Sequence, residues 1–267
     1  MAGASRRIGN AALAGLAAWA LPLGLIVVWE AASLVGLIPA RVLPAPSDVA
    51  IAFWRNLQNG TLLAATAIST ERALLGLAIG GGVGFVLGLL SGIWRGAETV
   101  FDSSMQMLRN VPHLAIIPLV ILWFGIGEEA KVFLVAIGTL FPIYLNTFHG
   151  IRTVDAGLVE MARVYGLGRL ALFWRVILPG ALPSILIGLR YALGIMWLTL
   201  IVAETISASS GIGYMTMNAR EFLQTDVVLL GIILYALLGK LADAVTRLIE
   251  RRALAWHPAY QPATREA

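Results

Sequence analysis

Long runs of apolar residues, rather than short alternations of apolar and polar positions, dominate this chain. A helix needs about 20 mostly apolar residues to cross about 30 Å of hydrocarbon, because each residue adds about 1.5 Å. Six stretches have this character, although charged residues interrupt the last two. They are residues 10–35, 73–94, 110–127, 132–151, 182–206 and 227–248. The pattern therefore predicts an all-α membrane protein with six transmembrane helices.

The first of these stretches has two interpretations. Arg6 and Arg7 precede it as a basic segment, as in a cleavable signal peptide. The apolar core of a signal peptide is only about 7–15 residues long, whereas the uncharged run here extends from Ile8 to Trp29. We therefore expect a retained membrane anchor.

The composition excludes several classes of protein. Hydrophobic residues make up 59% of the 267 residues and charged residues only 13%, about half the share of about 25% in soluble domains. The mean hydropathy is +0.84. Such a chain cannot cover a water-facing surface with charge, which argues against a soluble enzyme, a nucleic-acid-binding protein or a disordered chain. Because the chain has no cysteine, disulfides and thiolate metal sites are excluded.

The net charge of +4 is better explained by membrane topology than by a nucleic-acid partner. With six spans both termini share one side, and that side holds twelve Lys or Arg residues against four on the other. Arg72, Arg190 and Lys240 fit neither side clearly. Because positive residues concentrate in cytoplasmic loops, we predict that both termini are cytoplasmic.

Three connections are longer than simple turns. Residues 36–72 are expected in the periplasm, with an extended segment at Pro44 and Pro46 and a short helix capped by Ser47. Residues 207–226 are also expected there, with a hinge at residues 211–213. Residues 152–179 form the longest cytoplasmic connection, and we expect this connection to be structured.

Glycine recurs at every fourth position of the second apolar stretch. These residues are Gly76, Gly80, Gly84, Gly88 and Gly92. They fall on nearly one helix face, where the missing side chains allow another helix to approach closely. The face is either a static packing seam or a seam that slides during transport, and the two interpretations are compatible.

A few polar residues interrupt the spans and are candidates for a path or gate. Charges within a membrane are costly and are therefore candidates for function. Arg190 lies about two turns from the cytoplasmic end of its helix, where a long side chain can reach the interface. The candidate residues for the path are Asn110, His113, Asn146, Arg190 and Glu204, together with His149.

No catalytic or metal-binding constellation is recognisable. His113, His149 and His257 have no acidic or histidine partner at ligand spacing. The phosphate-binding pattern G-x-x-x-x-G-K-[ST] is absent from the sequence. We therefore expect no cofactor and no enzymatic activity, and any nucleotide hydrolysis would belong to another subunit.

The most specific pattern lies in the cytoplasmic connection 152–179. Residues 158–165 are predicted as a short helix that Gly166 ends in a left-handed conformation. Residues 170–177 are predicted as a second short helix, which Pro179 stops. This helix–glycine–helix projection would expose apolar residues to a protein partner, or alternatively lie on lipid as an amphipathic helix. The residues of the pattern are Glu160, Met161, Ala162, Gly166, Val176, Leu178 and Pro179.

This pattern resembles E-A-A-x-x-x-G, nine residues, I-x-L-P, the coupling loop of permease subunits of binding-protein-dependent ABC importers. Met161 replaces the usual alanine and Val176 the usual isoleucine. The likeness covers residues 21–260 and is closest to the aliphatic sulfonate permeases, within the sulfonate, taurine and nitrate branch. The further similar segments are residues 106–113, 121–127, 203–207, 217–226 and 256–260.

The resemblance implies a type I ABC importer permease fold in a bacterial inner membrane. It also implies a homodimer that binds two copies of a separate ABC ATPase and one periplasmic sulfonate-binding protein. ATP-driven closure of the ATPases would act through the coupling loop and drive alternating access. Residues 1–62 would hold the N-terminal tail, first span and periplasmic connector, residues 63–250 the transmembrane domain, and residues 251–267 a cytoplasmic tail.

Several alternatives remain open. Within transport, the cargo would be an aliphatic sulfonate or instead taurine, nitrate or another small anion. A polytopic membrane enzyme is disfavoured because no acid–base or metal cluster is present in the sequence. A proton-coupled secondary transporter is disfavoured by the coupling-loop pattern.

Overall fold

The computed structural model describes residues 20–257, and these residues are arranged in helices joined by short connections. The chain divides into two compact units. The smaller unit consists of Met1–Leu63 and Met215–Ile233, and the larger unit of Ala64–Tyr214 and Leu234–Ala267. The boundaries between the units fall inside helices α3, α10 and α11.

The smaller unit contains the first apolar helix and α2. Of the first predicted span, Ala20–Leu34 form an apolar helix, Val35 lies in the turn that follows, and residues 10–19 lie outside the described residues. Helix α2 (Pro46–Gln58) begins directly after Ala45, which is extended, and carries proline in its first turn. The prediction that Ser47 caps this helix is wrong. Ser47 lies inside the first turn, where its backbone N–H donates to Glu30 Oε2 at 3.1 Å.

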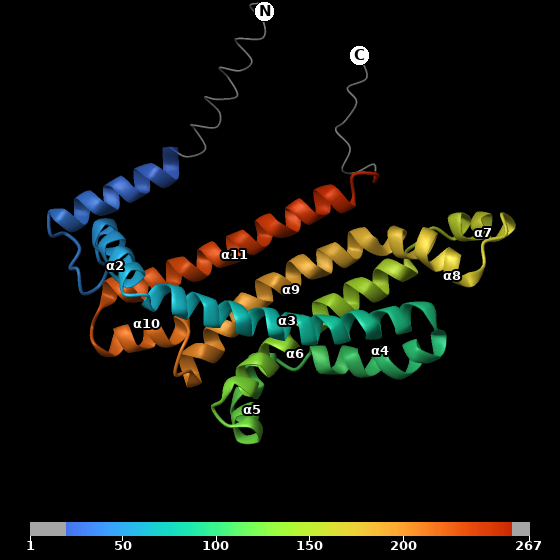
Figure 1. The fold of residues 1–267 in the computed structure, drawn as a ribbon, viewed down its shortest axis with the longest axis horizontal. Coiled ribbons are helices and arrows are strands. Elements are labelled where there is room, and N and C mark those ends of the chain that lie inside the picture. Colours follow the sequence, from blue (N-terminus) through green and yellow to red (C-terminus); the bar gives the residue numbers. More distant parts are fainter. Residues whose placement is uncertain (1–19, 258–267) are drawn as a thin grey trace, which may run out of the picture. The chain divides into compact units, whose positions relative to one another are not determined.

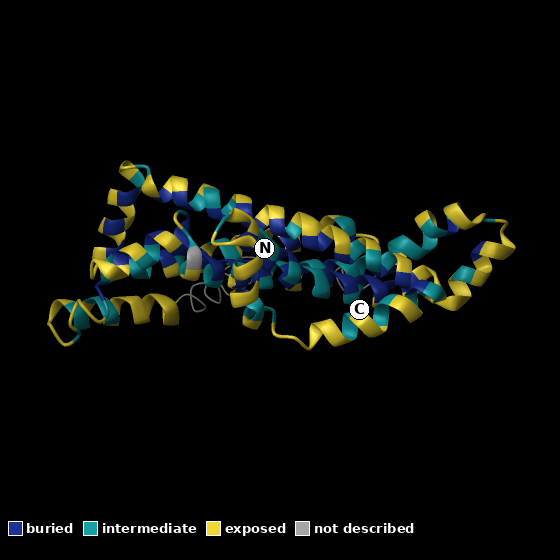
Figure 2. Cartoon of the chain, turned by 90° about the horizontal axis from the view of Figure 1, so that it is seen from below, coloured by how far each residue is buried: buried dark blue, intermediate teal, exposed yellow. Residues whose placement is uncertain are grey.

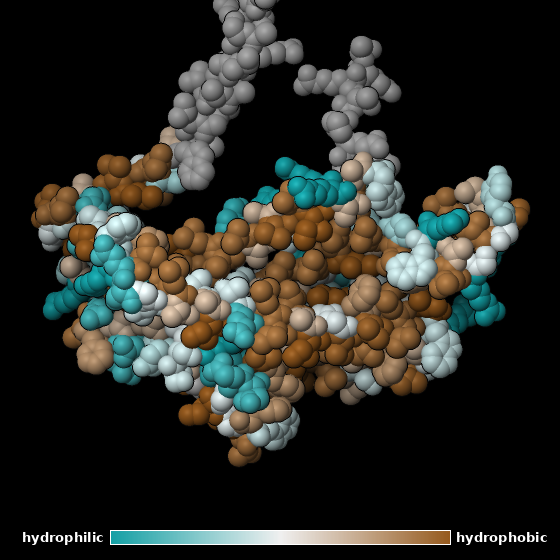
Figure 3. Space-filling model, in the orientation of Figure 1, coloured by the Kyte–Doolittle hydropathy of each residue, from teal (hydrophilic) through white to brown (hydrophobic). Residues whose placement is uncertain are grey.

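Four long apolar helices confirm four of the predicted spans by length and composition. They are α3 (Thr61–Ile93), α6 (Glu128–Arg152), the continuous segment Arg169–Ile206 and α11 (Thr225–Ala253). One side of α3 exposes Leu75, Ile79, Val83 and Val86. Figure 3 shows a largely hydrophobic surface over the long helices, as expected for segments in contact with lipid.

The third predicted span, residues 110–127, is not one continuous transmembrane helix. The chain forms a 3-10 turn at His113–Ile116 and the eight-residue helix α5 (Ile117–Phe124), which ends at Gly125 with φ of 71°. At about 1.5 Å per residue α5 is only about 12 Å long, too short to cross alone. This segment pairs with α4 (Arg95–Arg109) across an 80° bend. Pro112 explains the break, because the residue before a proline is disfavoured in a helix.

The prediction that Pro179 stops a helix is also wrong. Helix α8 (Arg169–Leu172) passes through a π-helical turn (Phe173–Ile177) directly into α9 (Leu178–Ser207). Pro179 lies in the first turn of α9, where its missing N–H and its ring are tolerated. The wider π-turn therefore lets one helical segment continue past the proline.

Helices α3 and α6 approach each other along the glycine face. A Cβ atom on Gly84 would overlap the Leu140 carbonyl oxygen, and one on Gly88 would lie 2.7 Å from the carbonyl oxygen of Tyr144. Gly76, Gly80 and Gly92 also lie against α6. This seam lies within one subunit, and α6 in turn packs along α9. Figure 2 shows the buried residues gathered on the sides of the helices that face one another.

Candidate functional site

The helix–glycine–helix projection is built from α7 (Ala156–Val164) and α8. Asp155 caps α7, because its Oδ1 accepts the backbone N–H of Gly157 at 2.7 Å. Gly166 ends the helix with φ of 80°, the left-handed conformation predicted from the sequence. The Leu167 N–H donates to the Ala162 carbonyl at 3.1 Å, which closes the turn in the manner of a Schellman motif. Figure 1 shows α7 and α8 extending beyond the ends of α6 and α9.

The projection exposes large apolar side chains. Val164 is 86% exposed and Tyr165 is 78% exposed, and Leu170 and Trp174 farther along the chain are also exposed. Glu160 and Met161 are exposed on α7, whereas Ala162 is buried. An exposed apolar patch of this kind indicates a binding surface for another molecule.

The sequence pattern is divided between the tip and the base of this projection. Glu160, Met161, Ala162 and Gly166 lie on α7 and its terminal turn. Val176 lies in the π-turn, and Leu178 and Pro179 begin α9. The turn at Gly166 separates the tip from α8, and from α8 the chain continues as helix into α9.

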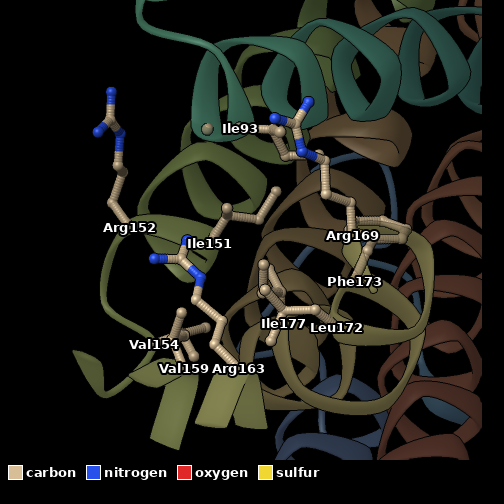
Figure 4. Close-up of a pocket in the computed structure, with 11 residues that line it drawn as sticks. Ile93, Ile151, Arg152, Val154, Val159, Arg163, Arg169, Leu172, Phe173 and Ile177 are labelled. Carbon is tan, nitrogen blue, oxygen red and sulfur yellow. The ribbon is translucent and has the colours of Figure 1, made fainter. Parts of the chain in front are cut away.

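The base of the projection encloses a hollow of about 660 Å³. Residues from the ends of α3 and α6 form one side of this hollow, and residues of α7, α8 and the π-turn form the other. Figure 4 shows Ile151, Leu172 and Ile177 between the side chains of Arg163 and Arg169. The hollow is therefore apolar inside, with arginine at its edges.

The predicted path residues do not form one cluster. Within the described residues, none of Asn110, His113, Asn146, Arg190 and Glu204 shares a hydrogen bond or ion pair with another. Asn110 is exposed at the end of α4. His113 Nε2 lies 3.0 Å from Thr199 Oγ1, and the Asn146 amide donates to the Pro142 carbonyl at 2.8 Å.

Arg190 is neutralised by acidic residues of α11. Its guanidinium forms an ion pair with Glu250, whose side chain is only 5% exposed. Its Nε also lies 3.9 Å from Asp243 Oδ1. Arg190 therefore joins α9 to α11 and does not present a free positive charge.

Glu204 is buried and lies in an ion cluster. Arg72 Nη1 donates to Glu204 Oε1 at 2.6 Å, and the Tyr235 hydroxyl donates to Oε2 at 2.8 Å. The Ser69 hydroxyl and the Gly213 N–H donate to the same carboxylate at 2.8 and 2.9 Å. All these partners hold the turn between α9 and α10 (Ile212–Glu221) against α3 and α11.

A second carboxylate balances the charge of this cluster. Arg72 makes a bidentate ion pair with Glu128, and its Nη atoms also donate to the carbonyl and hydroxyl oxygens of Ser210. The buried Lys131 lies 3.3 Å from Glu128 Oε1. Two positive and two negative groups are thus combined; Arg72, Lys131 and Glu204 are buried, whereas the Glu128 side chain is 56% exposed, so the cluster extends from the interior to the surface.

Sequence reasoning identified Glu204 but missed its partners. The charge pattern places Arg72 on neither side of the membrane and counts Lys131 among the four positive residues opposite the termini, and it does not indicate Glu128 or Tyr235 as members of the cluster. The available signal was the rule that a charge within an apolar span pairs with another such charge. Glu204 meets that condition, and Arg72 directly precedes the apolar run that begins at Ala73.

Comparison with known proteins identifies the family. Residues 80–254 match the family described as binding-protein-dependent transport system inner membrane component. The chain is 64% identical to "Putative aliphatic sulfonates transport permease protein SsuC" of Escherichia coli K12, over 92% of this chain and 93% of that protein. A protein of the same description from Bacillus subtilis 168 is 47% identical over 90% of this chain and 87% of its own length.

A solved structure has a similar fold. It is described as "Crystal structure of an amino acid ABC transporter with histidines" and has a TM-score of 0.58, with 18% identity over 75% of this chain and 97% of that one. At this identity the likeness concerns the fold alone. The sequence matches, which extend over most of the chain, carry the assignment: the chain is an ABC importer permease and belongs to the binding-protein-dependent transport system inner membrane components.

Proposed function

We propose that this chain is the membrane permease of an ATP-driven importer that moves aliphatic sulfonates into the cell by alternating access. The observation that carries this proposal is the 64% identity, over nearly the full length of both chains, to a protein described as an aliphatic sulfonates transport permease. Taurine, nitrate and other small anions are the alternative cargoes.

In this proposal residues 152–179 are the coupling loop. Its exposed apolar face, formed around Val164 and Tyr165, would dock into a separate ATPase subunit. ATP hydrolysis would take place on that subunit, and this chain would carry no covalent chemistry. The continuous helical connection from α8 into α9 supports a mechanical role, because a packed helix transmits displacement.

The proposed assembly is a homodimer of this chain with two ATPase copies and one periplasmic binding protein. Both termini lie in the cytoplasm, the transmembrane domain spans residues 63–250, and residues 1–62 and 251–267 flank that domain. Reporter fusions at Asn59 and Ser210 are then expected in the periplasm, and a fusion at Leu167 in the cytoplasm. A cytoplasmic reporter at Asn59 would reverse the proposed orientation.

The proposal places substrate choice mainly in the binding protein. Arg190 is the positive residue that the sequence offered for anion recognition, and its charge is already balanced by Glu250. Asn110, His113 and Asn146 remain proposed path residues, each at a different place in the larger unit. Glu204 is better described as a fixed part of the gate region, because its carboxylate oxygens already accept hydrogen bonds.

Transport in reconstituted vesicles tests the function directly. The chain is reconstituted with its ATPase and binding protein, and ATP-dependent uptake of a labelled alkanesulfonate is measured with taurine and nitrate as competitors. Uptake is expected only when ATP and the binding protein are both present. Preferential uptake of taurine or nitrate would transfer the assignment to that anion, and uptake without ATP would contradict an ABC importer.

A further inference from the structure

The arginine hollow at the base of the projection has an apolar floor at the end of two spanning helices. Ile93 is the last residue of α3, and Ile151 lies in the last turn of α6. Leu172, Phe173 and Ile177 complete the apolar lining from the other side. A charged residue stands at the end of each apolar run, Arg95 after α3 and Arg152 at the end of α6, as expected where hydrocarbon meets headgroups.

The three arginines of the hollow differ in how their charge is balanced. Arg152 forms an ion pair with Glu98. Neither Arg163 nor Arg169 has an ion pair with a carboxylate in the described part of the chain. The nearby Asp155 carboxylate caps α7 instead. The hollow therefore offers two uncompensated guanidinium groups beside an apolar surface.

We propose that this arginine hollow binds the headgroup of an anionic phospholipid. The phosphate lies at the edge of the hollow, within reach of the flexible side chains of Arg163 and Arg169, and the first part of an acyl chain rests on the floor formed by Ile93, Ile151 and Ile177. Guanidinium groups bind phosphate through paired charge-assisted hydrogen bonds. A volume of about 660 Å³ lies within the range of about 300–1,000 Å³ of ordinary ligand sites.

A lipid fits this site better than a soluble anion or a protein carboxylate. A small soluble anion would leave the apolar floor without a partner, whereas an amphiphile satisfies both the floor and the arginines. The surface suited to a protein partner is a different part of α7, at Val164 and Tyr165, where exposure is much greater than at Val159 or Leu172. The lipid would fill the space behind the projection and hold it against the ends of α3 and α6. This proposal does not depend on the direction of transport or on the cargo.

Lipid binding to the purified full-length chain tests the proposal. Native mass spectrometry counts bound phosphatidylglycerol or phosphatidylcholine during a titration in detergent. The parent chain is expected to prefer phosphatidylglycerol by about tenfold or more, because the choline of phosphatidylcholine offsets the charge of its phosphate. Each near-surface arginine contributes about fivefold for an anionic lipid, so the double variant Arg163→Gln, Arg169→Gln is expected to weaken phosphatidylglycerol binding about 25-fold, to weaken phosphatidylcholine binding much less, and so to lose the preference.

Two further variants test whether lipid binding depends on these two arginines or on the positive charge of the chain as a whole. Arg251→Gln, Arg252→Gln removes two exposed arginines from the end of α11 and is expected to leave binding as in the parent. Arg163→Lys, Arg169→Lys keeps the charge without the paired donors and is expected to retain part of the preference. If Arg251→Gln, Arg252→Gln lost as much phosphatidylglycerol affinity as Arg163→Gln, Arg169→Gln, the proposed binding site would be refuted.

The remaining outcomes also decide the question. Equal affinity of the parent for both lipids overturns the proposal, and this comparison needs no variant to fold. Displacement of phosphatidylglycerol by millimolar inorganic phosphate would assign the hollow to a soluble anion instead. Loss of ATPase copurification with unchanged lipid binding in the double glutamine variant would assign both arginines to protein docking.

Discussion

The substitution Glu204→Gln tests most directly how much the buried ion cluster contributes to stability. The amide has nearly the shape of the carboxylate but has one oxygen, whereas Glu204 accepts hydrogen bonds at both oxygens. With the NH2 group at the Oε2 position, the Gly213 N–H loses its acceptor. With the NH2 group at the Oε1 position, it faces the guanidinium of Arg72. Either orientation leaves a buried donor unsatisfied and one positive charge uncompensated.

The expected loss of stability is large for a one-atom change. Removing one member of a buried ion pair destabilises a protein by about 3–5 kcal/mol. Asp226→Asn is a matched control, because it breaks the exposed pair with Arg55, in which the side chains are 57% and 27% exposed. Exposed pairs contribute only about 0–1 kcal/mol. The losses of stability from the two acid-to-amide changes should therefore differ by about 2 kcal/mol or more.

Unfolding of the purified chain in mixed micelles, followed by tryptophan fluorescence, measures both effects. The double variant Arg72→Leu, Glu204→Leu removes one positive and one negative charge and leaves Glu128 with Lys131. Its loss of stability should be smaller, by about 0.5–3 kcal/mol, than the sum of the losses measured for Arg72→Leu alone and Glu204→Leu alone. A Glu204→Gln variant within about 1 kcal/mol of the parent, equal to the control, would refute this description of the cluster.

Three further predictions concern the seam, the projection and Arg190. Gly84→Leu should destabilise the subunit by about 1–3 kcal/mol through overpacking against α6, whereas Gly82→Leu, in open space, should not; equal yields and melting temperatures would refute the seam. Gly166→Val places a β-branched residue at φ of 80° and should weaken binding-protein-stimulated ATP hydrolysis while insertion is retained. Gly168→Val, at negative φ, is its control, and normal stimulation in the Gly166 variant would remove the loop from the coupling mechanism. Arg190→Gln should lower uptake of all sulfonates alike, and a changed order among them in competition assays would place a selective site in this chain.

Local features of the fold were predictable from the sequence. The long apolar helices follow from hydropathy alone, and the glycine face follows from a spacing of four residues. The left-handed Gly166 follows from its place after a short amphipathic helix. Each of these features depends on residues close together in the chain.

The features that the sequence did not predict depend either on two local preferences that oppose each other, such as a proline and a π-turn, or on contacts between helices that are far apart in the sequence. Pro112 and Pro179 are the same residue type, yet one breaks a span and the other lies within a continuous helix because a π-turn accommodates it. The partners of Glu204 come from α3 and α11, so the cluster requires knowledge of which helices are neighbours. Apolar periodicity carries no such information.

The ion cluster also has a consequence for how the chain is made. Arg72 precedes Glu128 by 56 residues and Glu204 by 132 residues. At a synthesis rate of about 5–20 residues per second, Glu128 is added about 3–11 s after Arg72, and Glu204 about 7–26 s after Arg72. An unpaired arginine is unfavourable by about 2.5–3.5 kcal/mol at the centre of a membrane helix on insertion scales, and by less at the position of Arg72, which directly precedes the apolar run that begins at Ala73. During ribosomal synthesis α3 must therefore be retained by its apolar residues alone, and its charge is neutralised only when α6 and α9 have emerged.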